Sequence, residues 1–102
     1  MFVIWGENNK LKSLCLRKLA FPTGLEVDDE EKYLLVCEMG QNRVLRFVLD
    51  DNLSGNYTVF HQFSGRFGPS AICCYDSKFY VSLFEFSELS SKGEVVALAS
   101  NG

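Results

Sequence analysis

Short apolar runs alternate with polar turns along the whole chain, and this spacing predicts β-strands. Gly, Asn, Asp or Ser bounds most of the runs, and none of them needs a helix longer than one turn. In the first two thirds of the chain the expected strands are FVIW (2–5), SLCLRKL (13–19), GLEV (24–27), KYLLVCE (32–38), RVLRFVL (43–49) and YTVFHQF (57–63).

The pattern inside these runs predicts which faces are buried. KYLLVCE is apolar at successive positions, which is typical of a strand covered on both faces. In GLEV, Leu25 and Val27 share one face and Glu26 takes the other. YTVFHQF alternates, so we expect one side of it to carry Tyr57, Val59, His61 and Phe63.

Three polar segments between the strands predict turns. DDEEK (28–32) is a charged turn, and DDNLSGN (50–56) is rich in turn-forming residues. EMGQN (38–42) contains Gly40 and Asn42, which can both adopt positive φ.

The order of strands then restarts in the second half of the chain. Matching residues lie 47 positions apart in the first strand (Pro22 and Pro69, Leu25 and Ile72, Val27 and Cys74), 46 apart in the second (Lys32-Tyr33-Leu34 and Lys78-Phe79-Tyr80) and 51 apart in the third (Val44-Leu45 and Val95-Val96). A repeat of this length, built from four strands, is the mark of a β-propeller blade.

We therefore expect an all-β fold: a β-propeller segment of about two four-stranded antiparallel blades from a larger ring. Residues 1–20 would form the strand pair of a preceding blade, residues 21–65 a complete blade, and residues 66–102 an incomplete following blade. Propellers close with about four to eight blades, because each blade buries its faces against two neighbours. A two-blade piece would expose apolar faces and unpaired strand edges.

Two explanations for the missing blades stay open. The chain could be a fragment of a longer propeller, or three copies could close a six-bladed ring as a homotrimer. The terminal ALASNG favours the fragment, because Asn-Gly is a strong hairpin-turn signal that should lead into a further strand. The expected partners are accordingly the remaining blades of a longer chain or copies of this one.

Composition changes this picture little. The 102 residues are 47% hydrophobic and 23% charged, with a net charge of −3, as in an ordinary globular protein. The Lys and Arg residues are scattered, so no nucleic-acid surface is expected. The opening MFVIWGENNK has no basic segment and only a short apolar run, so neither a signal peptide nor a membrane span is expected.

The four cysteines, Cys15, Cys37, Cys73 and Cys74, all lie in apolar runs. None belongs to a C-x-x-C motif, and His61 is the only histidine, so a structural zinc site is not expected. Buried free thiols that pack as small hydrophobes are favoured over two disulfides, which fits a reducing, cytoplasmic compartment.

One loop argues for the secretory pathway instead. Asn52 and Asn56 each begin an N-x-S/T motif, which would be glycosylated if the protein were secreted. Such short motifs also arise by chance in polar loops. The compartment therefore stays open.

A family resemblance rests on two stretches. FPTGLEVDDEEKYLLVCEMGQNRVLRF (21–47) resembles a blade of the six-bladed propellers of the gluconolactonase and senescence-marker-protein family and of the related strictosidine-synthase-like proteins. GRFGPSAICCYDSKFYVSLFEF (65–86) looks like the following blade. NHL-repeat propellers share the same rhythm, and the likeness covers about residues 20–99.

The resemblance implies a calcium-like divalent metal in the channel, held by oxygen ligands from F-P-N-G and P-D-G motifs. The matching positions here are Thr23 and Ser70, so neutral hydroxyls replace an amide and a carboxylate. Hydroxyls are weaker ligands for a hard cation. Strictosidine-type enzymes use a glutamate, and the one carboxylate at a strand end in the matching motif is Glu38, which we expect to face solvent.

Two functions from different classes follow. The first is a propeller scaffold that binds a ligand or a protein; the alternative is a metal-dependent lactonase or ester hydrolase, or a strictosidine-synthase-like enzyme. No G-x-S-x-G motif supports a hydrolytic triad. His61 falls on the expected outermost strand, away from a channel, where a structural role is favoured over general-base catalysis. Thr23 and Ser70 favour the scaffold.

Overall fold

The computed structural model describes residues 2–7, 10–15, 19–49, 57–64, 67–85 and 93–100. The described part is all-β, with antiparallel sheets and one short 3-10 turn. In chain order the elements are β1 (Phe2–Glu7), β2 (Lys10–Cys15), β3 (Pro22–Val27), β4 (Tyr33–Glu38), η1 (Met39–Gln41), β5 (Arg43–Val48), β6 (Tyr57–Gln62), β7 (Phe67–Tyr75), β8 (Lys78–Glu85) and β9 (Gly93–Leu98).

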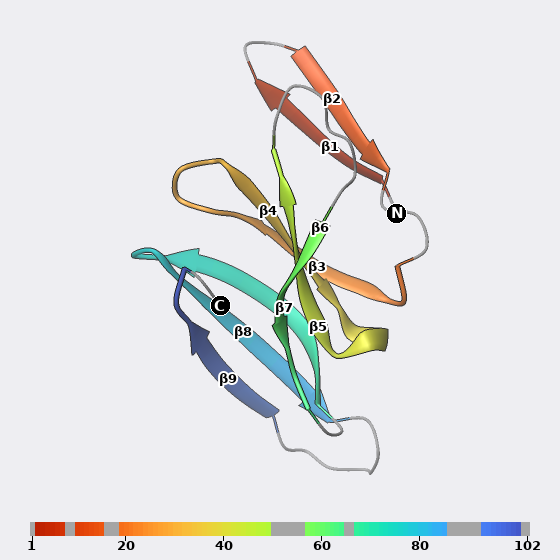
Figure 1. The fold of residues 1–102 in the computed structure, drawn as a ribbon, viewed down its shortest axis with the longest axis vertical. Coiled ribbons are helices and arrows are strands. Elements are labelled where there is room, and N and C mark those ends of the chain that lie inside the picture. Colours follow the sequence, from red (N-terminus) through yellow and green to blue (C-terminus); the bar gives the residue numbers. More distant parts are fainter. Residues whose placement is uncertain are drawn as a thin grey trace.

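Each sheet is made of consecutive strands in their sequence order. β1 pairs with β2, strands β3 to β6 form a four-stranded sheet, and strands β7 to β9 form a three-stranded sheet. The four-stranded sheet lies between the β1–β2 hairpin and the three-stranded sheet (Figure 1). Within the described residues, no helix has the length and apolar character needed to cross a membrane.

Strand β4 is buried on both faces, as its apolar run predicts. Leu35 and Cys37 face the three-stranded sheet and belong to one apolar cluster. Leu34 and Val36 face the other way and belong to a second cluster with Leu45 and Phe47. A strand in this position stabilises two layers at once, which explains why no polar residue interrupts it before Glu38.

The main core fills the space between the two larger sheets. It is built from Leu35, Cys37, Val44 and Phe60 on one side and from Ile72, Phe79, Val81, Leu83 and Leu98 on the other. The first strands of the two sheets, β3 and β7, run closest together. A Cβ atom added to Gly24 would lie 3.2 Å from the Cα of Ala71, so the glycine permits this approach.

The two larger sheets repeat one another in detail. In β3 the register against β4 shifts between Pro22 and Gly24, which leaves Thr23 as an extra, bulged residue. In β7 the register against β8 shifts between Pro69 and Ala71, which leaves Ser70 in the same role. Thr23 and Ser70 are 47 positions apart, so both bulges fall at one position of the repeat.

The strand registers also correct the expected offset of the second strand. Leu25 pairs with Val36 and Ile72 with Val81, so β4 and β8 correspond at 45 positions and not at 46. Val36 pairs with Leu45 and Val81 with Val96, which confirms the offset of 51 for β5 and β9. A shift of one residue matters because it reverses the face of every side chain in the strand.

The predicted alternation of β6 is wrong, and a bulge is the reason. His61 pairs with Val44 and Val59 pairs with Leu45, which leaves Phe60 without a cross-strand partner. The extra residue reverses the alternation, so Val59 and His61 lie on opposite faces. Phe60, expected on the opposite side from His61, is buried in the core between the sheets.

The turn after β4 follows the prediction in part. Asn42 adopts the left-handed conformation, with φ 54°. Gly40 is needed for a different reason, because a Cβ added there would lie 2.7 Å from the Cβ of Ala20 and 2.8 Å from its carbonyl oxygen. The segment before β3 thus packs directly on this turn, and the Gly40 N–H donates to Ala20 O at 2.9 Å.

Candidate functional site

Thr23 and Ser70, the two expected metal-ligand positions, lie on neighbouring strands at the end where β3 and β7 begin. The Thr23 hydroxyl donates to the carbonyl oxygen of Pro69 at 2.8 Å and so joins the two sheets. The Ser70 hydroxyl lies 2.8 Å from the Ser82 hydroxyl and donates to the Ser82 carbonyl at 3.3 Å. Both hydroxyls are thus engaged in bonds within and between the sheets.

These residues do not fit a calcium site. A hard cation needs several oxygen ligands, and carboxylates supply most of the charge that holds it. Here both hydroxyls are neutral and already hydrogen-bonded. In the described ranges, no group of three or more His, Cys, Asp or Glu side chains comes close enough to hold a metal ion.

Glu38 lies at the same end, and the expectation that it faces solvent is wrong. Its side chain is buried, with 1% exposure, and it is the one buried charged residue in the part of the chain that the structure describes. One carboxylate oxygen accepts the Ala20 N–H at 2.9 Å. The other accepts the Nε–H of Arg43, with which it forms an ion pair.

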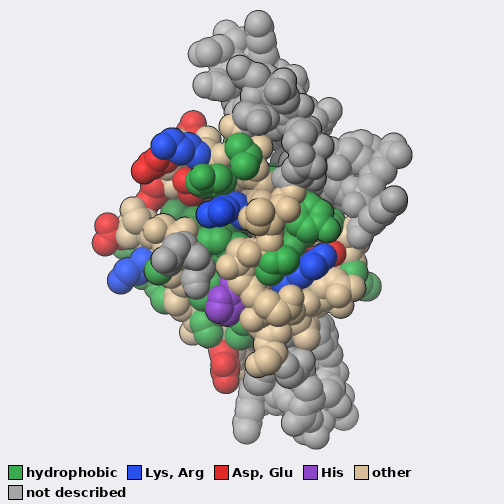
Figure 2. Space-filling model, viewed as in Figure 1, with side chains coloured by type: hydrophobic (Ala, Val, Ile, Leu, Met, Phe, Trp, Pro, Cys, Tyr) green, Lys and Arg blue, Asp and Glu red, His purple; other side chains and the backbone are tan. Residues whose placement is uncertain are grey.

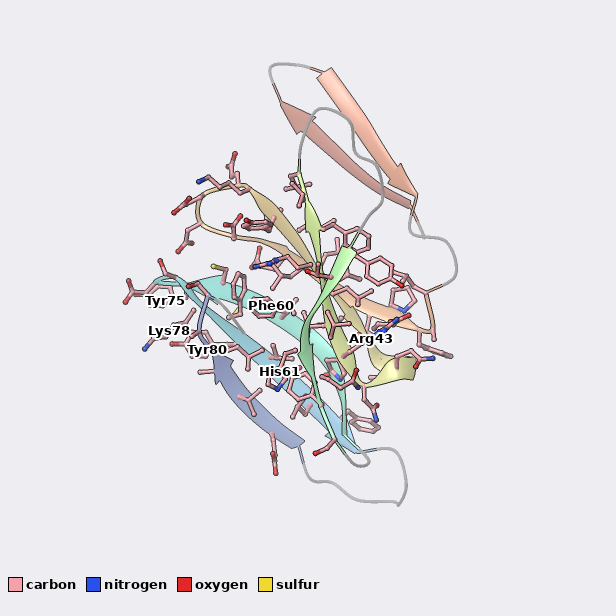
Figure 3. The ribbon with its side chains drawn as sticks, in the orientation of Figure 1. Arg43, Phe60, His61, Tyr75, Lys78 and Tyr80 are labelled. Atoms are coloured by element: carbon pink, nitrogen blue, oxygen red, sulfur yellow. The ribbon has the colours of Figure 1, made fainter. Side chains whose placement is uncertain are left out.

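The Arg43 partnership explains why a carboxylate can be buried here. A buried charge is tolerated when it is paired and hydrogen-bonded. The hydrogen bond to Glu38 raises the pKa of the Arg43 guanidinium further above its usual value. Arg43 also stacks over the ring of Tyr57, 5.8 Å from its centroid, and lies beside the η1 turn (Figure 3). Glu38 therefore acts as an anchor between three segments of the chain.

The opposite end, where β3 and β7 finish, is held by carboxylates that reach from one sheet to the other. Glu26 accepts the backbone N–H of Cys74 at 2.9 Å, and Asp29 accepts the N–H of Ser77 at 2.8 Å. Asp28 stays within its own turn and accepts the N–H groups of Lys32 and Tyr33 at 2.7 and 2.9 Å.

A cleft of about 380 Å³ opens between the sheets at this end. Its floor is apolar, with Leu35 and an edge-to-face pair of rings, Phe60 and Phe79, whose centroids are 5.4 Å apart. Acidic and basic side chains gather over the neighbouring β3–β4 turn (Figure 2). The polar residues of the cleft wall are Asp28, Asp29, Glu30, Lys32, Arg46, Ser77 and Ser100.

Arg46, expected to be one of the scattered solvent-facing arginines, lies instead in the wall of the cleft. It pairs with Leu35 across β4 and so projects from the face that carries the main core. Its guanidinium stacks on the ring of Tyr33, 4.6 Å from the centroid. Among the described residues it forms no ion pair. The signal was present, since Arg46 interrupts the apolar run RVLRFVL at a core-facing position.

The remaining candidates fall elsewhere. His61 lies on the outer strand β6, half-exposed, with its ring 4.6 Å from that of Phe63 (Figure 3). Cys37 is a buried thiol as expected, whereas Cys73 is exposed and Cys74 half-buried, because the two lie on opposite faces of β7. Burial raises the pKa of the Cys37 thiol to about 12. Asn52, Asn56 and the side chain of Cys15 lie outside the described residues.

Neither a scan against protein-family models nor a search of the curated proteins finds a match to this chain.

Proposed function

We propose that the chain forms neighbouring blades of a six-bladed β-propeller of the gluconolactonase, strictosidine-synthase and NHL type, and that it serves as a non-catalytic binding scaffold. Three observations support the propeller. Each larger sheet is an antiparallel meander in sequence order, the first strands of the two sheets lie together, and both first strands carry a bulge at the same repeat position.

The way in which the sheets stack gives further support. Leu83 in the second sheet corresponds to Glu38 in the first, and Val81 corresponds to Val36. Val81 and Leu83 face the first sheet, whereas Val36 faces away from the second. The contact is therefore head-to-tail and not face-to-face, and a head-to-tail contact can be repeated until a ring closes.

A head-to-tail stack leaves one face of the second sheet for a further sheet. Val95, which corresponds to Val44, is 70% exposed, whereas Val44 is fully buried by the second sheet. Cys73, Tyr75 and Phe84 are also exposed on this outer face. An exposed apolar sheet face marks an interaction surface. We propose that another blade covers it, from a longer chain or from a second copy.

The proposal of a non-catalytic scaffold is carried by the Thr23–Pro69 hydrogen bond. A hydroxyl that closes the seam between two sheets serves the packing of the blades and not a metal ion. Its counterpart Ser70 is bound to Ser82, and Glu38 has both carboxylate oxygens occupied. The metal-dependent lactonase remains the alternative hypothesis, and no contact of the described residues favours it.

A calcium titration of the purified chain tests this proposal. We expect isothermal titration calorimetry to show no stoichiometric binding at millimolar calcium. Thr23→Asn combined with Ser70→Asp would restore the side chains found in the family motifs and serves as a comparison for any weak signal. One saturable calcium site in the unmodified chain would contradict the scaffold and favour the enzyme.

Light scattering tests the uncovered face. We expect the isolated chain to associate with itself as its concentration rises, and Val95→Lys to reduce this association. A native mass near three times 11.5 kDa would identify copies as the missing blades. A monomer at every concentration, with or without the Val95 substitution, would contradict the proposal that this face is normally covered.

A further inference from the structure

We infer that the cleft between the two sheets is a binding site for a small organic monocarboxylate with a ring or similar apolar body. The carboxylate would pair with the guanidinium of Arg46, and the body would lie on the floor formed by Phe60 and Phe79. This inference goes beyond the proposed scaffold function, because it names the ligand class and the residue that selects it.

Arg46 lies at a position where a charge needs a partner. Its side chain projects between the sheets, where the neighbouring core residues are apolar. A charge in such a position costs free energy unless it has a partner. The equivalent residue in the second sheet is Ala97, so the packing of this strand does not require an arginine at this position. Arg46 is therefore specific to this cleft.

The carboxylates around Arg46 are bound to other groups. Asp28 is bound by two backbone N–H groups, Asp29 by Ser77, and Glu30 by the ammonium of Lys32 at 2.8 Å. None of them forms an ion pair with Arg46 in the structure. The guanidinium lies over the Tyr33 ring and forms no ion pair among the described residues, so its N–H groups can form the two parallel bonds that suit a carboxylate.

The dimensions and charges of the cleft limit the size and charge of its ligand. At about 380 Å³ the cleft falls within the usual range for small-molecule sites. Its apolar floor suits an aromatic or aliphatic body. Glu30 is paired with Lys32, but Asp28 and Asp29 have no cationic partner within the described ranges of the chain. These two carboxylates would repel a second negative charge, so the cleft should accept a monoanion and reject a dianion.

The test uses the full chain labelled with ¹⁵N and three probes of one shape: phenylacetate, the neutral 2-phenylethanol and the dianionic phenyl phosphate. We expect phenylacetate to shift the amide signals of residues that line the cleft, and the other two probes to bind at least about tenfold more weakly, as expected for one charge-assisted pair. Arg46→Gln should weaken phenylacetate binding by a similar factor, whereas Arg46→Lys should restore part of it.

Lys78→Gln is the matched control, because it removes one positive charge from an exposed position outside the cleft. It should leave phenylacetate binding unchanged. Circular dichroism establishes that each variant is folded before it is titrated. The inference is overturned if phenylacetate does not bind, if 2-phenylethanol or phenyl phosphate binds equally well, or if Arg46→Gln binds as the unmodified chain does. These results are independent of the calcium titration, so either proposal can fail alone.

Discussion

Arg43 and Arg46 lie on the same strand, three residues apart, but their side chains point to opposite faces of the sheet and have different partners. Arg43 faces away from the second sheet and is paired with the buried carboxylate of Glu38. Arg46 faces the second sheet and lies over the ring of Tyr33. Among the described residues, no carboxylate forms an ion pair with it. The first arginine completes a structural ion pair, whereas the second lies in the wall of a cleft without an ion-pair partner in the part of the chain that the structure describes.

The two ends of the sheets differ in the same way. At the end of Thr23 and Glu38, each polar group of the expected active site is satisfied by another group of the chain. At the opposite end the carboxylates are satisfied, yet the cleft still contains the guanidinium of Arg46. The difference teaches that polar residues at positions where the sequence predicts ligands can be fully engaged in structural bonds.

The largest expected effect comes from Glu38→Ala. It would leave Arg43 without its partner and the Ala20 N–H without an acceptor, so we expect a loss of about 2–4 kcal/mol in the free energy of unfolding. Urea denaturation measures this loss. Glu94→Ala, at an exposed position of β9, is the control and should change stability by less than about 0.5 kcal/mol. Equal effects of the two substitutions would show that Glu38 is not an anchor.

The next effect concerns the turn on which the segment before β3 packs. Gly40→Ala would force a Cβ against Ala20, so we expect it to destabilise the protein by about 1–3 kcal/mol. Gly93→Ala is the matched control, because its nearest non-neighbouring atom would be 3.7 Å away, an ordinary contact. Thermal unfolding of both variants decides the point. A tolerated alanine at position 40 would mean that this end is looser than the structure shows.

A smaller effect separates the structural and the metal-binding roles of Thr23. Thr23→Val keeps the shape and removes the hydrogen bond to Pro69, which should cost about 1 kcal/mol. Thr58→Val, at an exposed position of β6, is the control and should be close to neutral. The loss at Thr23 should be the same with calcium and with a chelator. A loss seen only in the presence of calcium would support the metal site instead.

The sequence predicted well those features that depend on continuous burial. The apolar run of β4 requires two covered faces. The repeat offsets between β3 and β7 and between β5 and β9 follow from side chains that fill equivalent places in the two sheets. It did not predict the bulge at Phe60, because an extra residue in a strand leaves no mark in the pattern and reverses the alternation after it.

The candidate site was less accessible to sequence reasoning, for a related reason. Glu38 ends a strand and precedes a turn, which usually means exposure, yet Arg43 returns across that turn and buries it. The pair of a strand-ending Glu and an Arg just beyond the turn could have indicated the contact. The cleft itself arises from two sheets that only the tertiary structure brings together, so no local pattern could define its walls.

The smallest expected effect is measured without mutation, by comparing how fast the thiols at the two ends of the sheets are alkylated. Cys74 lines the cleft, and burial together with its hydrogen bond to Asp29 raises its pKa to about 11. Because the thiolate is the nucleophile, alkylation of Cys74 by iodoacetamide should accelerate about tenfold per pH unit between pH 8 and 10. Cys37, fully buried in the core, should stay unmodified while the fold persists, and the exposed Cys73 should react first.

Cys73 and Cys74 are adjacent and share a peptide, so tandem mass spectrometry is used to locate the alkylated residue and to read each rate separately. Phenylacetate should slow the reaction at Cys74 and leave that at Cys73 unchanged, because only Cys74 lines the cleft. If Cys37 reacts as fast as Cys74, the core between the sheets opens as readily as the cleft does. The contrast between a closed structural end and an accessible cleft would then fail.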